Sequence, residues 1–313
     1  MKVLVKASNW LGDAVMTLPT LVSLREMLPK GSTISVLTKP AFAELYPDFA
    51  DEVLLHERGG VKPWLNTVRE LKARKFDTAL LMTRSFSAAL LAFSARVPRR
   101  IGHGKAMLTD PVKRGGGHRV LDFHRLLEPL GTPPKPRAPK IQVRTEALRW
   151  AEDTLPGGPW IGLNPGATYG AAKQWYPERF IELGKRLGRK IVVVGGPAEA
   201  ELGERVAKGV DGLNLAGKTT LPRLAAVLAR CRLFVTNDTG PMHVADAVGT
   251  SMVAIFGPTD WIETPPFGTS HTIVRHEIEC APCKKRVCPL GHHDCMKKLG
   301  VETVLRACQE RLR

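Results

Sequence analysis

Short apolar runs alternate along the chain with longer segments of mixed apolar and polar residues. Up to residue 96, the short runs predict strands at 2–7, 33–37, 52–55 and 78–82. The longer segments between them predict helices at 14–28, 41–49, 64–74 and 87–96. Strands that alternate with helices are typical of a parallel sheet with helices on both faces. The first part of the chain is therefore expected to be a doubly wound α/β domain.

A proline-rich stretch interrupts this pattern. Prolines stand at 133, 134, 136 and 139, and a proline lacks the amide hydrogen that helices and sheets need. The alternation then resumes, with strands expected at 160–164, 190–194, 213–216, 233–236 and 252–256, and helices at 145–154, 177–187, 199–208, 221–230 and 241–248. We expect two α/β domains, 1–140 and 141–313, that face each other across a cleft.

Polar, glycine-bearing segments follow several of the predicted strands. They are SNWLGD at 8–13, PGATYGAAKQW at 165–175, GGPAE at 195–199 and NDTGPMH at 237–243. In open α/β sheets, ligands bind beyond the carboxyl ends of the strands, where such segments converge. Each domain is therefore expected to provide one wall of a binding site.

Asp13 lies where the first strand leads into a helix. One interpretation is a helix cap, because an aspartate there accepts hydrogen bonds from the free amides of the first turn. The other is a general base, because a reaction at a hydroxyl group needs a carboxylate that accepts its proton. The position alone leaves both interpretations open.

The second domain carries two candidate groups for binding an anion. Gly240 and Pro241 open a helix after Asp238 and Thr239, and amides at such a helix start suit a diphosphate. Alternatively, Asp238 or Thr239 is an ordinary cap. Lys173 lies in a small-residue loop, where its ammonium could neutralise a diphosphate or could simply be solvated. Together these groups favour a nucleoside-diphosphate ligand in this domain.

The formal net charge is +16, which indicates an acidic partner. Aromatic residues make up only 6% of the chain, fewer than single-stranded nucleic-acid binders use for base stacking, so no nucleic-acid partner is expected. No apolar run approaches the ~18 residues that would span a bilayer, and the N-terminus does not resemble a signal peptide. We expect a cytoplasmic protein that contacts a membrane only from its surface.

The segment 96–119 is basic and rich in glycine. We expect a mobile loop that binds a phosphorylated acceptor at an anionic membrane, where each basic residue adds ~1 kcal/mol. The alternative is a solvated loop without a ligand. Its candidate acceptor-binding residues are Arg99, Arg100, Lys105, Lys113 and Arg114.

Four cysteines cluster between residues 280 and 295, at Cys280, Cys283, Cys288 and Cys295. Their spacing is compatible with a structural zinc site, with an iron–sulfur site, or with free thiols that form occasional disulfides. In each case we expect a structural role.

Four motifs together resemble the ADP-heptose:lipopolysaccharide heptosyltransferase family, also called glycosyltransferase family 9. They are NWLGD at 9–13, PGA at 165–167 with Lys173 and Trp175, NDTGPMH at 237–243, and FGPT at 256–259. The likeness extends from about residue 2 to residue 308. Within the family, NWLGD and the segment CPLGHHDCM at 288–296 resemble the members that add the second heptose.

The resemblance implies a GT-B fold with two Rossmann-like domains and an inverting transfer that needs no metal ion. It implies that Asp13 is the base and that ADP-L-glycero-D-manno-heptose is the donor, with heptosyl-Kdo2-lipid A at the inner membrane leaflet as the acceptor. The residues implied in donor binding are Thr168, Lys173, Glu199, Asp238, Thr239, Gly240 and His243.

Three alternatives stay open at this point. The enzyme could add the first or third heptose, it could be a GT-B epimerase, or the chain could be a basic nucleic-acid-binding protein with a cysteine knuckle.

Overall fold

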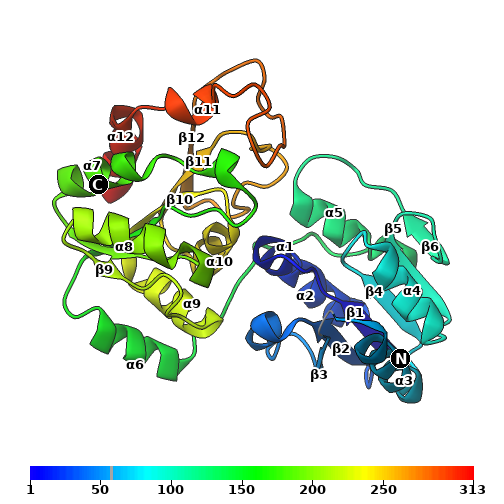
Figure 1. Ribbon diagram of the computed structural model, residues 1–313. Coiled ribbons are helices and arrows are strands. Elements are labelled where there is room, and N and C mark those ends of the chain that lie inside the picture. Colours follow the sequence, from blue (N-terminus) through cyan, green and yellow to red (C-terminus); the bar gives the residue numbers. More distant parts are fainter. Residues whose placement is uncertain (57–58) are drawn as a thin grey trace. The chain divides into compact units, whose positions relative to one another are not determined.

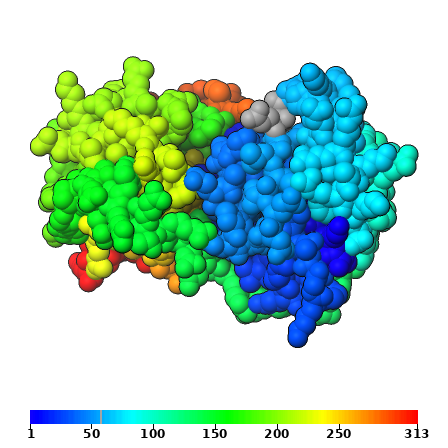
Figure 2. All heavy atoms as spheres, turned by 90° about the horizontal axis from the view of Figure 1, so that it is seen from below, coloured from blue at the N-terminus to red at the C-terminus, as the bar shows by residue number. Residues whose placement is uncertain are grey.

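The computed structural model describes residues 1–56 and 59–313. The chain divides into two compact units, Met1–Pro139 and Lys140–Arg313. The boundary lies one residue from the predicted one, within the proline-rich stretch. Figure 1 shows the elements of both units, and Figure 2 shows their heavy atoms as spheres.

Unit 1 contains one parallel sheet in the strand order β3-β2-β1-β4-β5-β6. The strands are β1 (Lys2–Lys6), β2 (Thr33–Thr38), β3 (Glu52–Leu55), β4 (Thr78–Leu81), β5 (Arg99–His103) and β6 (Asp110–Val112). The helices are α1 (Leu11–Met16), α2 (Leu18–Met27), α3 (Val61–Arg74), α4 (Phe86–Ser94) and α5 (Arg119–Arg125). Two short 3-10 turns, η1 (Pro40–Leu45) and η2 (Glu128–Leu130), complete the unit.

Unit 2 repeats this topology in the order β12-β11-β10-β7-β8-β9, again with all strands parallel. Its strands are β7 (Trp160–Asn164), β8 (Lys190–Val193), β9 (Leu213–Asn214), β10 (Cys231–Asn237), β11 (Met252–Phe256) and β12 (His271–Arg275). Its helices are α6 (Thr145–Thr154), α7 (Pro177–Leu187), α8 (Ala200–Gly209), α9 (Leu221–Arg230), α10 (Gly240–Val248), α11 (Asp294–Lys297) and α12 (Val301–Leu312), with 3-10 turns η3 (Ala171–Lys173) and η4 (Pro197–Glu199).

Each sheet is buried because both of its faces carry apolar side chains. Val3, Leu4 and Val5 of β1 are at most 1% exposed. A strand that is buried on both faces reads as a continuous apolar run, so the period-2 alternation of a one-sided sheet is absent. Burial of one such side chain stabilises the fold by roughly 1.5–3 kcal/mol. The central strands of both sheets are therefore rigid supports for the loops that follow them.

The C-terminal segment is bound tightly to the loop after β7. Trp175 is fully buried, stacks edge-to-face on Phe180 at 5.1 Å, and donates its indole N–H to the carbonyl of Leu299 at 2.9 Å. The guanidinium of Arg179 donates to the carbonyls of Met296 and Leu299. These contacts fix the segment that directly follows Lys173.

The structure corrects several expected elements of unit 1. The helix expected at 14–28 is two helices, α1 and α2, because Pro19 cannot donate a helical hydrogen bond and starts a new helix. The helix expected at 41–49 is the 3-10 turn η1. The basic segment is not a loop throughout, since it forms β5, β6 and the start of α5. In unit 2, β12 and α12 were not expected.

No helix among the residues that the structure describes is both long enough and apolar enough to span a membrane.

Candidate functional site

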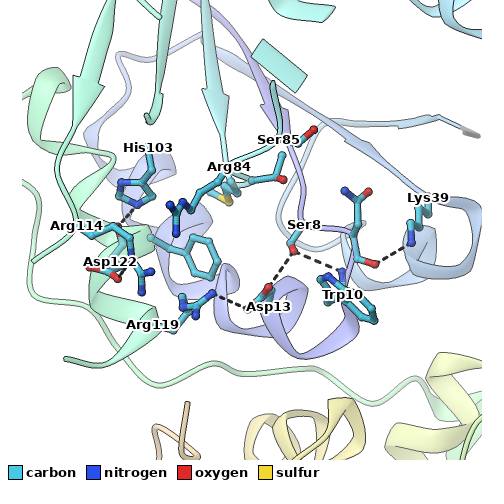
Figure 3. Close-up of a pocket in the computed structure, with 14 residues that line it drawn as sticks. Ser8, Trp10, Asp13, Lys39, Arg84, Ser85, His103, Arg114, Arg119 and Asp122 are labelled. Atoms are coloured by element: carbon cyan, nitrogen blue, oxygen red, sulfur yellow. Dashed lines mark hydrogen bonds and ion pairs between the residues drawn. The ribbon is translucent and has the colours of Figure 1, made fainter. Parts of the chain in front are cut away.

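Unit 1 has a pocket of about 530 Å³ at the carboxyl end of its sheet. Loops after β1, β2 and β4 and the end of β5 line it, together with residues 114–123 (Figure 3). The strand order reverses between β1 and β4, and ligands of doubly wound sheets bind at this switch point. The residues that line the pocket are Ser8, Asn9, Trp10, Asp13, Lys39, Met82, Thr83, Arg84, Ser85, His103, Arg114, Arg119, Asp122 and Phe123.

Asp13 lies in this pocket, in the first turn of α1. Helix α1 begins at Leu11, two residues before Asp13, and Trp10 occupies the cap position without a side-chain hydrogen bond. Asp13 is therefore not the cap of this helix. The hydroxyl of Ser8 donates to Oδ2 of Asp13 at 3.4 Å, and Arg119 lies 3.6 Å from Oδ1. Both contacts fix a carboxylate that is 22% exposed and can reach a ligand in the pocket.

The pocket is rich in cations. Lys39, Arg84, Arg114 and Arg119 line it, against two carboxylates, Asp13 and Asp122. Asp122 is buried, and it accepts hydrogen bonds from the guanidinium of Arg114 and, at 2.9 Å, from the amide of Gly115. Figure 3 shows the guanidinium of Arg84 pointing into the same space. An anionic ligand therefore suits this pocket.

Sequence reasoning missed most of these residues. Lys39, Arg84 and His103 were missed; each lies at the end of a strand or in the loop that follows it, and that position is the signal by which they could have been found. The signal becomes usable only when the strand order is known, because the order decides which loops converge.

Only one of the five basic residues predicted to bind the acceptor lines the pocket, and that is Arg114. Arg99 pairs with Asp110 at 3.0 Å. Arg100 donates to the carbonyl of Met107 at 2.6 Å, so both guanidinium groups support the β5–β6 edge of the sheet. Lys105 and Lys113 are exposed and lie outside the pocket.

Unit 2 brings the predicted donor residues Lys173 and Asp238 into contact. The ammonium of Lys173 lies 2.7 Å from Oδ2 of Asp238 and 2.9 Å from its carbonyl oxygen. The side chain of Lys173 is only 13% exposed, so the interpretation as a solvated surface lysine is wrong. The side-chain amide of Asn237 donates through Nδ2 to the carbonyls of Pro165 and Gly166. These bonds tie the loop after β7 to the end of β10. These are the two strands at the switch point of the second sheet.

The start of α10 adjoins this ion pair. Helix α10 begins at Gly240, and Thr239 at its cap position makes no side-chain capping hydrogen bond. His243 is buried one turn into the helix, and Thr168 lies exposed on the loop after β7. The first amides of a helix carry a partial positive charge, so this end of the sheet combines a lysine with an anion-binding backbone.

Glu199 lies at the end of the turn η4, next to two glycines. Its Oε2 accepts a hydrogen bond from the amide of Gly196 at 2.7 Å, while Oε1 is buried and has no partner among the described residues. A β-carbon at Gly166 would lie 2.2 Å from the Glu199 carboxyl, so only glycine leaves room for it. Burial raises the pKa of Glu199. A hydrogen-bond donor from a ligand would offset the free-energy cost of burying Oε1 without a partner.

The four clustered cysteines are free thiols in the structure. Burial, and secondarily the nearby sulfurs of Cys283, Cys280 and Cys288, raise the pKa of Cys295 to about 11. The amide of His293, followed by further amides of the same turn, lowers the pKa of Cys288. Within the described part of the chain, no three His, Cys, Asp or Glu side chains are placed to hold a metal ion, so the structure does not support a structural zinc.

The model of glycosyltransferase family 9 (heptosyltransferase) matches residues 64–293. Lipooligosaccharide heptosyltransferase 2 of Campylobacter jejuni is 30% identical, with 97% of each chain covered. The structure of E. coli ADP-heptose LPS heptosyltransferase II is 25% identical, covers 100% of this chain and 98% of its own, and superposes with a TM-score of 0.84. A family 9 glycosyltransferase from Veillonella parvula, 24% identical with 99% and 97% coverage, has the same fold with a TM-score of 0.85.

These likenesses extend over the whole chain and over both six-stranded sheets, so the GT-B fold expected from the motifs is confirmed. The chain is a heptosyltransferase and belongs to glycosyltransferase family 9.

Proposed function

We propose that this enzyme transfers L-glycero-D-manno-heptose from ADP-heptose to heptosyl-Kdo2-lipid A, the growing inner core of lipopolysaccharide. The family match and the full-length likeness to heptosyltransferases 2 support this assignment. The structural observation that best supports the proposed transfer is the position of the Asp13 carboxylate in a pocket lined by cations. Such a pocket suits an acceptor that is both anionic and hydroxyl-bearing.

In this mechanism, Asp13 is the general base. An acceptor hydroxyl in the pocket of unit 1 gives its proton to the Asp13 carboxylate while its oxygen attacks the anomeric carbon of heptose. The bond from that carbon to the diphosphate breaks, and ADP leaves with the electron pair. One displacement on the face opposite the leaving group inverts the anomeric centre. Ser8 and Arg119 keep the carboxylate in position.

Unit 2 binds the donor. We infer that the diphosphate lies at the start of α10, next to Lys173, whose ammonium stabilises the negative charge of the departing ADP. Asp238 holds that ammonium in place at 2.7 Å. The phosphates receive polar contacts from Thr168, Thr239 and Gly240. His243 supports the start of α10. Oε1 of Glu199 accepts a hydrogen bond from a ribose hydroxyl. The lysine and the helix amides supply the charge that other glycosyltransferases obtain from a divalent ion, so the transfer needs no metal.

The acceptor is a lipid, so the enzyme works at the cytoplasmic face of the inner membrane as a peripheral protein. Arg84 and Arg114 of the pocket bind the anionic groups of the acceptor core. Arg99, Arg100, Lys105 and Lys113, which lie outside the pocket, contribute to the positive potential around it.

ADP release tests this proposal. With ADP-heptose and purified heptosyl-Kdo2-lipid A, the enzyme should release ADP only when both are present, and excess chelator should not change the rate. ADP release that is equal without acceptor, or a rate that chelator abolishes at once and magnesium restores, would contradict it.

A further inference from the structure

Helix α4 exposes two phenylalanines on its outer face. Its nine residues, FSAALLAFS, contain no charge. The inward face consists of Ala88, Ala89, Leu91 and Ala92, which pack in the core of unit 1. The outward stripe contains Phe86, Leu90 and Phe93, at positions i, i+4 and i+7, which lie on one face of a helix. A surface helix normally has polar residues on its outward face, so α4 is unusual in being apolar on both faces.

The stripe is open to solvent. Phe86 is 58% and Phe93 is 51% exposed, and Leu90 is partly buried. Helix α3 lies beside α4 on the same face of the sheet (Figure 1), where its Val68 packs with the same core cluster. Within the described residues of α3, Leu65 is also exposed, at 40%. Clustered apolar residues of this kind mark a surface that binds a partner.

Positive charge adjoins the C-terminal end of the stripe. Arg96, which is exposed, follows the end of α4 directly, and the chain has no acidic residue between 84 and 109. Arg100 lies over the ring of Phe93, with 5.4 Å between its guanidinium carbon and the ring centroid. Exposed Lys62, Arg69 and Lys72 of α3 add to this charge. Exposed aromatic residues with cations beside them are typical of a helix that lies in the interface of an anionic membrane.

We propose that the outer face of α4 binds the surface of an anionic membrane, with Phe86, Leu90 and Phe93 inserted among the lipids and the adjoining cations on the headgroups. The helix starts directly after Arg84 and Ser85, which line the pocket of unit 1 (Figure 3). A membrane bound at α4 is therefore adjacent to the mouth of that pocket. This last step rests on the proposed lipid-linked acceptor, while the binding itself does not.

Vesicle co-sedimentation of the full chain tests the proposal. The wild type should bind vesicles that contain phosphatidylglycerol, bind phosphatidylcholine vesicles far less, and lose binding as salt rises. Phe86→Ser combined with Phe93→Ser should reduce binding to the anionic vesicles by at least roughly tenfold, because it removes apolar insertion. The matched control is Ile262→Ser in unit 2, which alters a side chain that is 63% exposed and should bind like the wild type.

A second readout separates this inference from the proposed function. On a deacylated, water-soluble acceptor, the double variant should transfer heptose as fast as the wild type, because neither phenylalanine lines the pocket. Unchanged vesicle binding by the double variant would overturn the inference. The inference would also be overturned if the wild type were a dimer, the double variant were a monomer, and both bound vesicles equally. That result would assign the stripe to self-association. Failure of the wild type on the soluble acceptor would contradict the proposed function alone.

Discussion

Asp13 lies in the pocket of unit 1, where its carboxylate contacts Ser8 and Arg119. Its position after β1 was compatible with a cap or with a base. The structure excludes the cap of α1, because the helix begins at Leu11. Its partners Ser8 and Arg119 could not be predicted together, since Arg119 follows Asp13 by more than a hundred residues and reaches it only through the packing of α5 on α1 and α2.

Asp13→Asn should lower turnover by roughly 10²–10⁴, the usual contribution of a general base. The amide keeps the shape of the carboxylate but cannot accept the proton. Stability should change by no more than about 1 kcal/mol, because the ion pair with Arg119 is partly exposed. Steady-state kinetics and thermal unfolding measure the two effects.

Asp153→Asn is the matched control, as Asp153 lies on α6, in the other unit, and should leave turnover unchanged. Affinity for ADP should persist in both variants. A folded Asp13→Asn enzyme with near wild-type turnover would remove Asp13 from the mechanism.

Lys173 and Asp238 form an ion pair with little exposure to solvent, so changing either residue alone should affect folding. Lys173→Ala leaves the Asp238 carboxylate, 4% exposed, without its cation, and Asp238→Ala leaves the ammonium without its anion. Each single change should destabilise the protein by about 3–5 kcal/mol, and the double change by clearly less than the sum. Denaturant unfolding of the wild type and the three variants gives the coupling free energy between Lys173 and Asp238.

The exposed pair of Arg186 and Glu302, 2.8 Å apart, is the control and should contribute no more than about 1 kcal/mol. Strictly additive effects at Lys173 and Asp238 would show that the contact has no energetic role. If the paired lysine also serves the diphosphate, the Lys173→Ala variant, where still folded, should lose affinity for ADP.

At the scale of elements, the central strands were predictable and the edges were not. Strands such as β1, β7 and β11 are buried on both faces, so each appears as an apolar run that the sequence reveals directly. The edge region β5 and β6 contains Arg99 and Asp110, charged residues that protect sheet edges from pairing with other chains. The same charges made this segment resemble a loop in sequence.

Helix α4 ends in an unusual way. The amide of Val97 donates to the carbonyl of Ala92 at 3.1 Å and the amide of Arg96 donates to Phe93 at 2.9 Å, the pattern of a Schellman cap. Arg96 occupies its left-handed position with φ +59°, where glycine is favoured. Arg96 thus places a positive charge beside Phe93, although its left-handed backbone conformation is strained.

Arg96→Gly should therefore stabilise the protein, by roughly 0.5–1 kcal/mol, because it relieves the left-handed strain. Arg69→Gly, inside the exposed face of α3, should instead destabilise it by about 1 kcal/mol. Thermal or denaturant unfolding of both variants compares them directly. Equal destabilisation by the two glycines would contradict the strain at Arg96.

In the whole molecule, the two units share the same strand order but have different functional groups at the switch point of the sheet. In each unit the site lies at the switch point, between β1 and β4 in unit 1 and between β7 and β10 in unit 2. Unit 1 offers a carboxylate among cations, and unit 2 offers a lysine beside a helix start. The net charge of +16 agrees with two anionic ligands.

If the pocket of unit 1 binds the acceptor, as we propose, the enzyme should discriminate between acceptors that differ in their number of heptoses. The enzyme should be incubated with ADP-heptose and with Kdo2-lipid A acceptors that carry zero, one or two heptoses, and the products identified by mass. We expect the acceptor with one heptose to gain one heptose, with a kcat/KM well above those of the other two. Preferred transfer to the acceptor with none or with two heptoses, or transfer to none of the three, would contradict it.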